Sequence, residues 1–320
     1  MGLGSNRRTV LVTGAAGFIG SHLVDRLLAE RFEVVGLDNL MTGDLENLVD
    51  AGRDPHFHLE IGDVRETLHV YAEIIFNLAC PASPVHYQSD PHATLTSSVL
   101  GALRLVEHAR SRRCRIVHAS TSEVYGDPLV HPQTEDYVGN VNPIGERACY
   151  DEGKRVAETM LMDARRVHGV DARIIRIFNT YGPRMAFGDG RVVSNFLLQA
   201  LEGLPITIYG NGEQTRSFCY VSDLIEGLVA VARVENFDPP VNLGNPEEYS
   251  MLQLAETAMK VAGRRVELER RPLPADDPRR RCPDISKAKR LLGFSPKVPL
   301  ERGLQETCDN FRARLAQREA

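Results

Sequence analysis

Tyr150 and Lys154 are the residues whose types and spacing point most directly to chemistry. Side chains four apart on a helix lie on the same face, so a helix here brings the phenol and the ammonium together. A nearby cation and a cationic ligand ring bound beside the phenol both favour the phenolate, and together they would lower a tyrosine pKa from its usual value of about 10. The pair therefore predicts a base that takes a proton from a sugar or alcohol hydroxyl near neutral pH.

Three further polar side chains follow an apolar run at 115–118, and these are Thr121, Ser122 and Glu123. Such a run reads as a buried strand, and the carboxyl ends of central parallel strands border the crevice where these sheets bind ligands. The Tyr-x-x-x-Lys spacing is common by chance, so it indicates a catalytic site only together with these strand-end residues. We expect the three residues to face the same ligand as Tyr150.

A glycine-rich turn near the start of the chain predicts a dinucleotide site. Gly14, Gly17 and Gly20 lie between a short β-branched run at 8–13 and a helical pattern at 18–30. One glycine permits a tight turn, another lets the backbone approach a pyrophosphate, and the third allows close packing of helix on strand. The helix N-terminus then offers free N–H groups to the phosphates. The position after a strand is the context that gives this motif its weight.

Asp38 closes the second predicted strand, eighteen residues after Gly20. A carboxylate there accepts hydrogen bonds from adenosine ribose hydroxyls and repels a 2′-phosphate. No arginine stands among the next four residues, so the cofactor predicted is NAD rather than NADP. Asp63 and Val64, after the third strand, are weaker candidates for an adenine contact. The predicted cofactor contacts are Gly14, Gly17, Phe18, Ile19, Gly20, Asp38, Asn39, Thr42, Gly43, Asp63, Val64, Leu78, Tyr150 and Lys154.

The elements that position these residues alternate between strand and helix. Strand-like runs at 8–13, 33–37, 56–59, 73–78, 115–118 and 172–177 are interspersed with helical patterns at 18–30, 92–111 and 148–168. This alternation predicts an α/β fold, a Rossmann-type doubly wound parallel sheet. No internal repeat interrupts it.

The pattern changes after about residue 178, where Gly-Pro pairs, arginines and long loops become frequent. We expect residues 1–178 to form the NAD-binding domain and 179–320 to form mainly a smaller α/β nucleotide-sugar-binding domain. Within it, residues of about 209–244 return to the main sheet, ending in a late strand at 241–244. A short helix is expected over 285–293.

Composition excludes several classes of protein. The chain has 320 residues, 42% of them hydrophobic, and a net charge of −5, so a general nucleic-acid binder is disfavoured. The six cysteines show no C-x-x-C spacing, so neither a disulfide framework nor a metal site is predicted. No stretch approaches the ~20 apolar residues that cross a bilayer, and we expect a soluble, cytoplasmic protein with no membrane partner.

Four longer motifs carry a resemblance to a known family. They read STSEVYGDPLVHPQTEDY, NPIGERACYDEGKRVAETM, RIFNTYGPRMAFGDGRVVSNF and VNLGNPEE. Glycine turn, strand-end hydroxyls and Tyr-x-x-x-Lys in this order resemble the extended short-chain dehydrogenase/reductases. The longer motifs resemble the UDP-glucuronic acid decarboxylases, also called UDP-xylose synthases, from about residue 8 to residue 312.

The resemblance implies a redox-neutral reaction on UDP-glucuronic acid. Bound NAD⁺ takes hydride from the sugar 4-position while Tyr150 takes the hydroxyl proton. The resulting 4-keto acid loses CO₂, and the hydride returns to give UDP-xylose. Lys154 orients the nicotinamide ribose, and Thr121 bridges the substrate oxygen and Tyr150. Ser122, Glu123 and Arg281 match positions associated with decarboxylation or with the substrate.

The same resemblance implies a substrate site rich in arginine, which suits a diphosphate and a carboxylate through bidentate hydrogen bonds. The implied substrate contacts are Thr121, Tyr150, Asn179, Arg191, Tyr209, Arg216 and Arg281. It also implies a homodimer formed through the 92–111 and 148–168 helices.

The sequence departs from the family at residues 94–98, Thr-Leu-Thr-Ser-Ser. Family members carry a Lys where this chain has Thr96 and an Asn where it has Ser98. We expect His92 or Arg104 to supply the missing basic group. The departure bears on substrate binding rather than on the catalytic core.

Three alternative functions stay open, and a fourth, a 4,6-dehydratase, is disfavoured. A UDP-hexose 4-epimerase shares Tyr150 and Lys154 but does not need Glu123 or Arg281. A 4,6-dehydratase carries an acid where this chain has Ser122. An oxidative decarboxylase has a similar core but releases the UDP-4-keto-pentose and NADH. A non-catalytic NAD-binding regulator does not need the Thr121, Tyr150 and Lys154 set.

Overall fold

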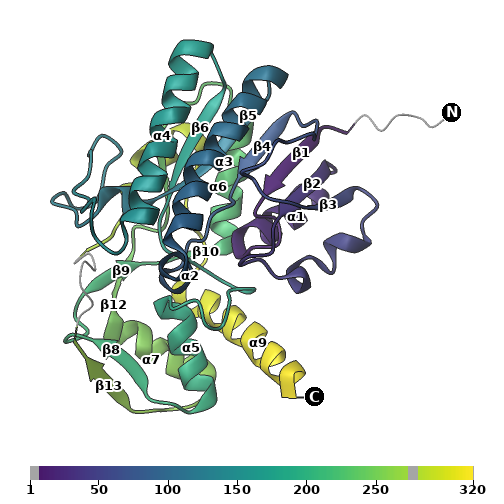
Figure 1. The fold of residues 1–320 in the computed structure, drawn as a ribbon. Helices are drawn as coiled ribbons and strands as arrows, with labels where there is room; N and C mark the ends of the chain where they lie inside the picture. Colours follow the sequence, from purple (N-terminus) through teal and green to yellow (C-terminus); the bar gives the residue numbers. More distant parts are fainter. Residues whose placement is uncertain (1–6, 273–279, 320) are drawn as a thin grey trace.

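The computed structural model describes residues 7–272 and 280–319, and its centre is a sheet of seven parallel strands (Figure 1). From edge to edge the strands are β11 (Val241–Leu243), β6 (Ala172–Ile177), β5 (Arg115–Thr121), β4 (Ile74–Asn77), β1 (Thr9–Thr13), β2 (Glu33–Asp38) and β3 (Phe57–Ile61). In register, Val12 of β1 lies opposite Gly36 of β2 and Phe76 of β4. The predicted doubly wound α/β fold is confirmed.

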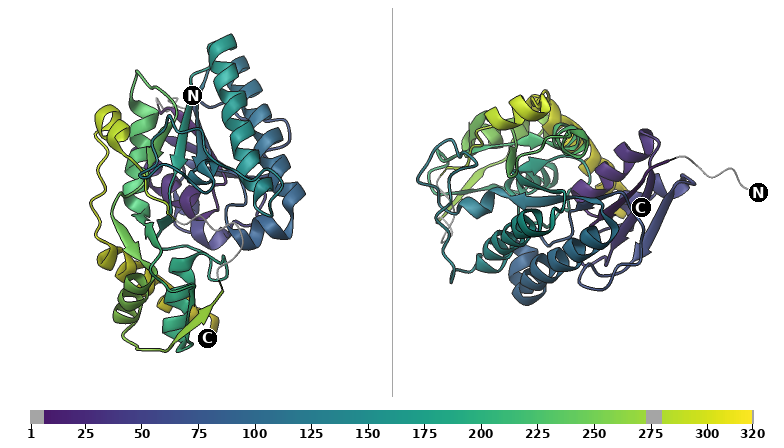
Figure 2. Two further views of the ribbon diagram at one scale, coloured as in Figure 1. Left: turned by 90° about the vertical axis from the view of Figure 1, so that its left-hand side faces the viewer. Right: turned by 90° about the horizontal axis from the view of Figure 1, so that it is seen from above.

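Helices cover both faces of the sheet (Figure 2). Helices α3 (Pro91–Arg112) and α4 (Ala148–His168) lie on one face. Helices α1 (Phe18–Ala29), α6 (Val221–Arg233) and α8 (Ser286–Leu292) lie on the other. Alternate strand residues point to opposite faces, so Leu11 packs with the α3–α4 side while its neighbour Val10 packs with the α1–α6 side. Burial on both faces explains the nearly continuous apolar strands.

Capping residues define where helix α3 begins and where helix α4 ends. The Asp90 carboxylate caps α3 by accepting from the amide of Ala93 at 2.9 Å, and Pro91 follows at the first turn. Gly169 ends α4 in the left-handed conformation, with φ 66°. The two helices pack side by side along the sheet.

The strand order reverses between β1 and β4, because β1, β2 and β3 run to one edge and β4, β5 and β6 to the other. In open α/β sheets the crevice at such a reversal is where ligands bind. Short elements border it, and these are α2 (Pro84–Ser89) and the 3₁₀ helices at Leu45–Leu48 and Ser122–Tyr125. A further 3₁₀ helix at Ala51–Arg53 packs against α1 and β3.

A smaller lobe covers one end of the sheet (Figure 1). It contains α5 (Val192–Glu202), α7 (Met251–Ala262) and the parallel pair β8 (Ile206–Tyr209) and β13 (Leu268–Arg271). Helix α9 (Leu300–Glu319) packs against α5 and α7. The connecting strands pair as β9 (Thr215–Ser217) with β12 (Glu248–Ser250), and β7 (Thr180–Tyr181) with β10 (Cys219–Tyr220).

The second half contains more helix than its sequence suggested. Sequence reasoning expected loops after residue 178, whereas α5, α6, α7 and α9 account for much of that region. The apolar residues of α6 recur at helical spacing and are buried, among them Leu224 and Leu228. Within the described part of the chain, no helix is both long and apolar enough to cross a membrane.

Candidate active site

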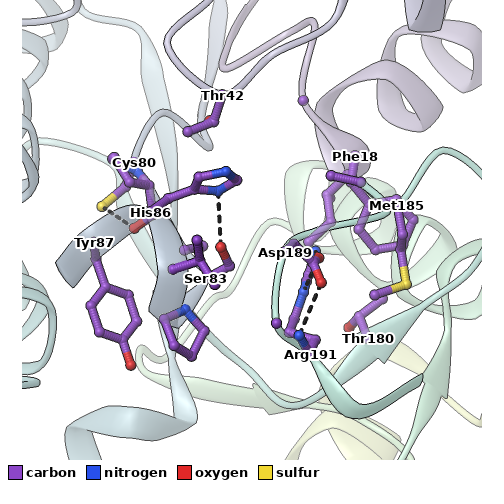
Figure 3. A pocket seen from close by; sticks show the side chains of 18 of the residues that line it. Phe18, Thr42, Cys80, Ser83, His86, Tyr87, Thr180, Met185, Asp189 and Arg191 are labelled. Atoms are coloured by element: carbon purple, nitrogen blue, oxygen red, sulfur yellow. Dashed lines mark hydrogen bonds and ion pairs between the residues drawn. The ribbon is translucent and has the colours of Figure 1, made fainter. Parts of the chain in front are cut away.

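One large cavity of about 950 Å³ opens at the carboxyl ends of the strands, between the sheet and the smaller lobe. On one wall, Cys80, Ser83, His86 and Tyr87 approach from the segment that leads into α2 (Figure 3). The segment from Thr180 to Arg191 forms the wall opposite. The cavity therefore joins residues that are far apart in the sequence.

The glycine turn forms one end of this cavity, and its close contacts explain the glycines. Gly14 has φ 71°, and a Cβ added there would lie 3.0 Å from the carbonyl of Leu78. A Cβ on Gly20 would lie 1.9 Å from the carbonyl oxygen of Gly14, so no side chain fits between turn and helix. Gly17 caps α1 without a side chain, which leaves the first-turn amides accessible to an anion.

Asp38 lies beside the turn, buried and rigidly held. One carboxylate oxygen accepts from the amide of Ala16 at 2.9 Å, and the other accepts from the amide of Leu40 at 2.8 Å. Burial raises the pKa of Asp38, although these two amides oppose the shift. Each oxygen keeps a lone pair, so the carboxylate can accept from a diol.

Asp63 behaves differently from Asp38. Its carboxylate pairs with Arg65 at 2.7 Å and accepts from the amide nitrogen of Asn39 at 2.9 Å. The Arg65 hydrogen bonds lower the pKa of Asp63 to about 2. Neither Asp63 nor Gly43 lines the cavity, although a Cβ on Gly43 would lie 2.8 Å from an Asp38 oxygen. The other predicted cofactor contacts do line it, namely Gly14, Gly17, Phe18, Ile19, Gly20, Asp38, Asn39, Thr42, Val64, Leu78, Tyr150 and Lys154.

Helix α4 brings Tyr150 and Lys154 to the middle of the cavity. The Lys154 ammonium donates to the carbonyl of Ala119 at 2.7 Å and lies 5.9 Å from the centre of the Tyr150 ring. The Thr121 hydroxyl acts on the Tyr150 phenol and favours a lower pKa for it. The 3₁₀ turn at Ser122–Tyr125 holds Thr121 in place, because the Thr121 hydroxyl also accepts from the amide of Glu123 at 3.2 Å.

The protein alone does not supply the low tyrosine pKa that the sequence suggested. Burial is the largest effect and raises the pKa of Tyr150, Cys80 adds to the rise, and the Thr121 hydroxyl opposes it. Burial also disfavours the charged form of Lys154 and lowers the pKa of that ammonium. The ammonium is directed at the Ala119 carbonyl, and the cost of burying a phenolate exceeds its help. Lowering the pKa of Tyr150 therefore requires charge brought by a ligand.

A largely buried ionic cluster lines the same cavity as Tyr150. Arg281 grips Glu123 with both terminal nitrogens, at 2.7 and 2.8 Å, and Arg147 reaches the same carboxylate at 2.7 Å. Burial by itself raises the pKa of Glu123, but the two guanidinium groups outweigh it and the net shift is downward. Glu123 is thus held ionised between two cations, and the trio has a net positive charge.

The remaining predicted substrate residues also line the cavity, and these are Ser122, Asn179, Arg191, Tyr209 and Arg216. Arg191 pairs with Asp189 at 2.5 Å and lies over the ring of Phe18, 5.5 Å from its centre. It therefore stands where the glycine turn and the opposite wall meet. Arg216 is on β9, and an isolated backbone bridge connects it to Arg281. The lining thus combines hydroxyl, amide and guanidinium groups.

The departure at Thr96 and Ser98 lies largely outside the cavity, because neither residue is part of its lining. The expected compensation by His92 or Arg104 is wrong, since Arg104 pairs with Glu107 on the surface and neither side chain lines the cavity. Arg65 instead donates to the Thr96 hydroxyl at 3.3 Å. A different arginine therefore contacts Thr96, and it is not part of the cavity lining.

Two lining residues were missed by sequence reasoning. Arg147 precedes α4 by one residue in an irregular segment, and no local pattern connects it with Glu123. The Tyr87 ring stacks on Tyr150 with centres 5.2 Å apart, and its buried hydroxyl has no partner within the described residues. An aromatic residue two positions after the Ser-Pro-Val of residues 83–85 was the only available signal. Within the described ranges no cluster of His, Cys, Asp and Glu is suited to a metal.

Comparison with known proteins gives a consistent result. The family model described as GDP-mannose 4,6 dehydratase matches residues 11–307. UDP-glucuronic acid decarboxylase 1 of Arabidopsis thaliana is 53% identical over 315 residues, 98% of this chain and 72% of the relative. UDP-glucuronic acid decarboxylase 6 of the same plant is 54% identical over 312 residues, 97% of this chain and 90% of the relative.

Solved structures share the fold at lower identity. The UDP-glucose 4-epimerase of Thermotoga maritima with UDP-glucose has a TM-score of 0.88 and 29% identity, covering 96% of this chain and 99% of that one. The UDP-glucuronic acid 4-epimerase of Bacillus cereus with UDP-glucuronic acid and NAD has a TM-score of 0.86 and 27% identity, with the same coverage. The chain therefore belongs to the UDP-glucuronic acid decarboxylases, within the family of the GDP-mannose 4,6 dehydratase model and the extended short-chain dehydrogenase/reductases.

Proposed function

We propose that this protein is an NAD-dependent enzyme that decarboxylates UDP-glucuronic acid to UDP-xylose through a 4-keto intermediate. The observation that carries the proposal is the Glu123–Arg281–Arg147 cluster on the same cavity as Thr121, Tyr150 and Lys154. The ionic cluster supplies positive charge for a substrate carboxylate. Thr121, Tyr150 and Lys154 serve the oxidation of a hydroxyl group. The names of the Arabidopsis relatives point to the same reaction.

The residues at the glycine turn fit NAD. The cradle at Gly14 and Gly20 has no room for a Cβ, and the accessible amides at the start of α1 suit a pyrophosphate. Asp38 suits a ribose diol and repels a 2′-phosphate. When bound, NAD supplies an acceptor for the hydride of the sugar 4-carbon and returns that hydride after the loss of CO₂. The Tyr150 and Lys154 side chains would lie against its nicotinamide half.

Tyr150 takes the proton of the sugar 4-hydroxyl in the oxidation step. The Thr121 hydroxyl contacts the phenol, so it can also accept or donate to the substrate oxygen and hold it in line. Lys154, anchored on the Ala119 carbonyl, places a positive charge beside the phenol, and this charge favours the phenolate. Since burial raises the pKa of Tyr150, the protein keeps the proton until substrate and cofactor are in place.

The oxidised sugar is a β-keto acid, whose carboxylate leaves as CO₂ while its electrons flow into the C4 carbonyl as an enolate. Arg281 and Arg147 both pair with the single carboxylate of Glu123, which leaves one positive charge in excess. That charge attracts the carboxylate of the uronic acid and stabilises the enolate. A proton from water then adds at C5 in place of the lost carboxyl group, and the hydride removed from C4 in the first step returns to it. Tyr150 returns its proton to the 4-oxygen in that last step.

The alternatives fit the site less well. A 4-epimerase does not need the ionic cluster of Glu123, Arg281 and Arg147. A 4,6-dehydratase needs an acid where this chain has Ser122. A non-catalytic NAD-binding regulator does not need the Thr121–Tyr150–Lys154 arrangement. The oxidative decarboxylase shares every residue named, so only its products distinguish it.

The test is incubation of the purified protein with UDP-glucuronic acid and NAD, followed by mass spectrometry and NMR of the products. We expect UDP-xylose and CO₂ in equal amounts, with no net rise in the absorbance of NADH. UDP-4-keto-pentose with one NADH for each CO₂ would establish the oxidative decarboxylase. UDP-galacturonic acid would establish an epimerase, and an unchanged substrate with tightly bound NAD would establish the regulator.

We also propose a homodimer that pairs the outer faces of α3 and α4. Supporting this, Leu95 and Leu100 of α3 and Val156 and Val167 of α4 are exposed apolar side chains. Light scattering after gel filtration is expected to give twice the 35.5 kDa of one chain. The scattered thiols suit a reducing compartment, and the cytoplasm remains our proposal for location.

A further inference from the structure

His118 lies on β5 beneath the floor of the cavity, and the mechanism above does not use it. It is 1% exposed, and it belongs to a chain of hydrogen bonds across three neighbouring strands. The Thr13 hydroxyl accepts from the amide of Ala79, a cavity residue, at 3.3 Å. It donates to the amide oxygen of Asn77 at 2.9 Å. The amide nitrogen of Asn77 then meets Nδ1 of His118 at 2.9 Å.

The direction of these bonds settles which ring nitrogen of His118 carries the proton. Asn77 uses its oxygen for Thr13, so its amide nitrogen faces the ring and donates to Nδ1. In the neutral imidazole the proton is then on Nε2. Burial is the main reason that the pKa of His118 is well below its usual value, and the Lys154 ammonium adds to that shift. The ring is therefore a neutral Nε2–H donor.

Nε2 of His118 is buried and has no hydrogen-bond partner among the residues that the structure describes. A buried donor without an acceptor is costly, and proteins commonly satisfy such groups with an internal water molecule. The Lys154 ammonium donates one proton to the carbonyl of Ala119, the residue that directly follows His118 on β5, and has two more protons to place. Two donors cannot bond to each other, but one water oxygen accepts from both.

We propose that His118 is a positioning residue, which holds the Lys154 ammonium in place through one buried water molecule that accepts from both side chains. The chain Ala79–Thr13–Asn77–His118 then connects the cavity wall beside the glycine turn to the catalytic lysine. Besides His118, the titratable groups that act on Lys154 are Cys80 and Glu158. The inference rests on the proposed function in one respect, since Lys154 is taken to act on Tyr150.

Two substitutions separate the two nitrogens of the ring. His118→Asn keeps a group at the Nδ1 position for Asn77 and removes the Nε2 donor. His118→Gln keeps an N–H at the Nε2 position and removes the contact with Asn77. We expect His118→Asn to lower kcat about tenfold, the usual effect of losing one hydrogen bond to a charged group, with KM unchanged. The acid limb of its kcat profile moves to higher pH, because Tyr150 becomes harder to ionise. His118→Gln is expected to restore both values to within about twofold.

A crystal structure of the NAD-bound protein tests the same idea without substrate or turnover. We expect a water oxygen within hydrogen-bond distance of both Nε2 of His118 and Nζ of Lys154, and its loss in His118→Asn. A dry gap between the two atoms would overturn the proposal, and so would equal losses of kcat in the Asn and Gln variants. If no substrate were turned over but the water were present, the proposed function would fail and the positioning role would stand.

Discussion

The two ends of the cavity are built in different ways. The cofactor end is made of backbone, because the turn from Gly14 to Gly20 and the two amides that donate to Asp38, those of Ala16 and Leu40, lie within 27 residues of chain. The decarboxylation end is made of side chains, and Glu123 and Arg281 are 158 residues apart in the sequence. A backbone site depends on which residues lack a Cβ, whereas a side-chain site depends on the fold that brings its charges together. Cofactor binding should therefore be lost when a side chain is added at the glycine turn. Decarboxylation should instead change when the charge of Glu123 or Arg281 is changed.

Tyr150 lies between the two ends, so its loss should be the largest effect of all. Tyr150→Phe removes the proton acceptor but keeps the ring that stacks on Tyr87. We expect kcat to fall at least about 1,000-fold, with NAD affinity unchanged, as measured by product formation and by calorimetry. Full activity in this variant would contradict the assignment of the base.

Arg281→Ala tests the side-chain end. The substitution leaves Glu123 paired with Arg147 alone, so the pKa of Glu123 rises and the site loses positive charge. We expect decarboxylation to slow about 100-fold, while oxidation at C4 continues and absorbance of NADH builds up in single-turnover experiments. Arg281→Lys is the matched control. Its decarboxylation rate should lie between those of the unaltered protein and Arg281→Ala, because lysine keeps the positive charge but not the two-pronged hydrogen bonding of the guanidinium group. Equal loss of oxidation and decarboxylation would indicate a purely structural arginine.

Gly20→Ala tests the backbone end. The added Cβ would lie 1.9 Å from the Gly14 carbonyl oxygen, so turn and helix must separate. We expect NAD affinity to fall about tenfold or more and the melting temperature to drop by several degrees, as seen by calorimetry and thermal scanning. Gly52→Ala is the control, because a Cβ there meets nothing within 4 Å. Similar NAD affinities in both variants would remove the argument for the cradle.

Asp151 offers the smallest and most specific test of charge at the side-chain end. Burial and the Glu123 carboxylate raise the pKa of Asp151 to about 7, and one of its oxygens has no hydrogen-bond partner in the described residues. A raised carboxyl pKa stabilises the fold at low pH, and this stabilisation is lost as the pH rises from about 4 to about 7.

Asp151→Asn removes that titration. We expect the variant to melt about 2–4 °C higher than the unaltered protein at pH 8, with the gain shrinking toward pH 4. Thermal scans across this pH range check the trend. A gain that did not change with pH would mean that the carboxyl group is not the source.

Sequence reasoning predicted the sheet well and picked out a glycine turn that lines the cavity, because both features depend on local patterns. The strand expected at 8–13 is found at Thr9–Thr13, and the helix expected at 148–168 is Ala148–His168. Buried parallel strands and a glycine turn leave continuous signals in the chain.

Three features escaped prediction for physical reasons. Helices α5, α6, α7 and α9 lie among segments rich in Gly and Pro, which hid their amphipathic patterns. Arg147 gains its meaning only when the fold places it on Glu123. In the protein alone the pKa of Tyr150 follows mainly from burial, which a helix spacing does not report. The expected lowering therefore depends on the charge of the bound ligand as well as on the ammonium.

The most direct test of the account follows one hydrogen atom through the reaction. UDP-glucuronic acid carrying deuterium at C4 is converted by the protein with its bound NAD, and the product is analysed by NMR and mass spectrometry. The account predicts UDP-xylose that keeps the deuterium at C4, because the carbon that gives up the hydride regains it in the same turnover. A UDP-4-keto-pentose without deuterium, together with deuterium in released NADH, would contradict it.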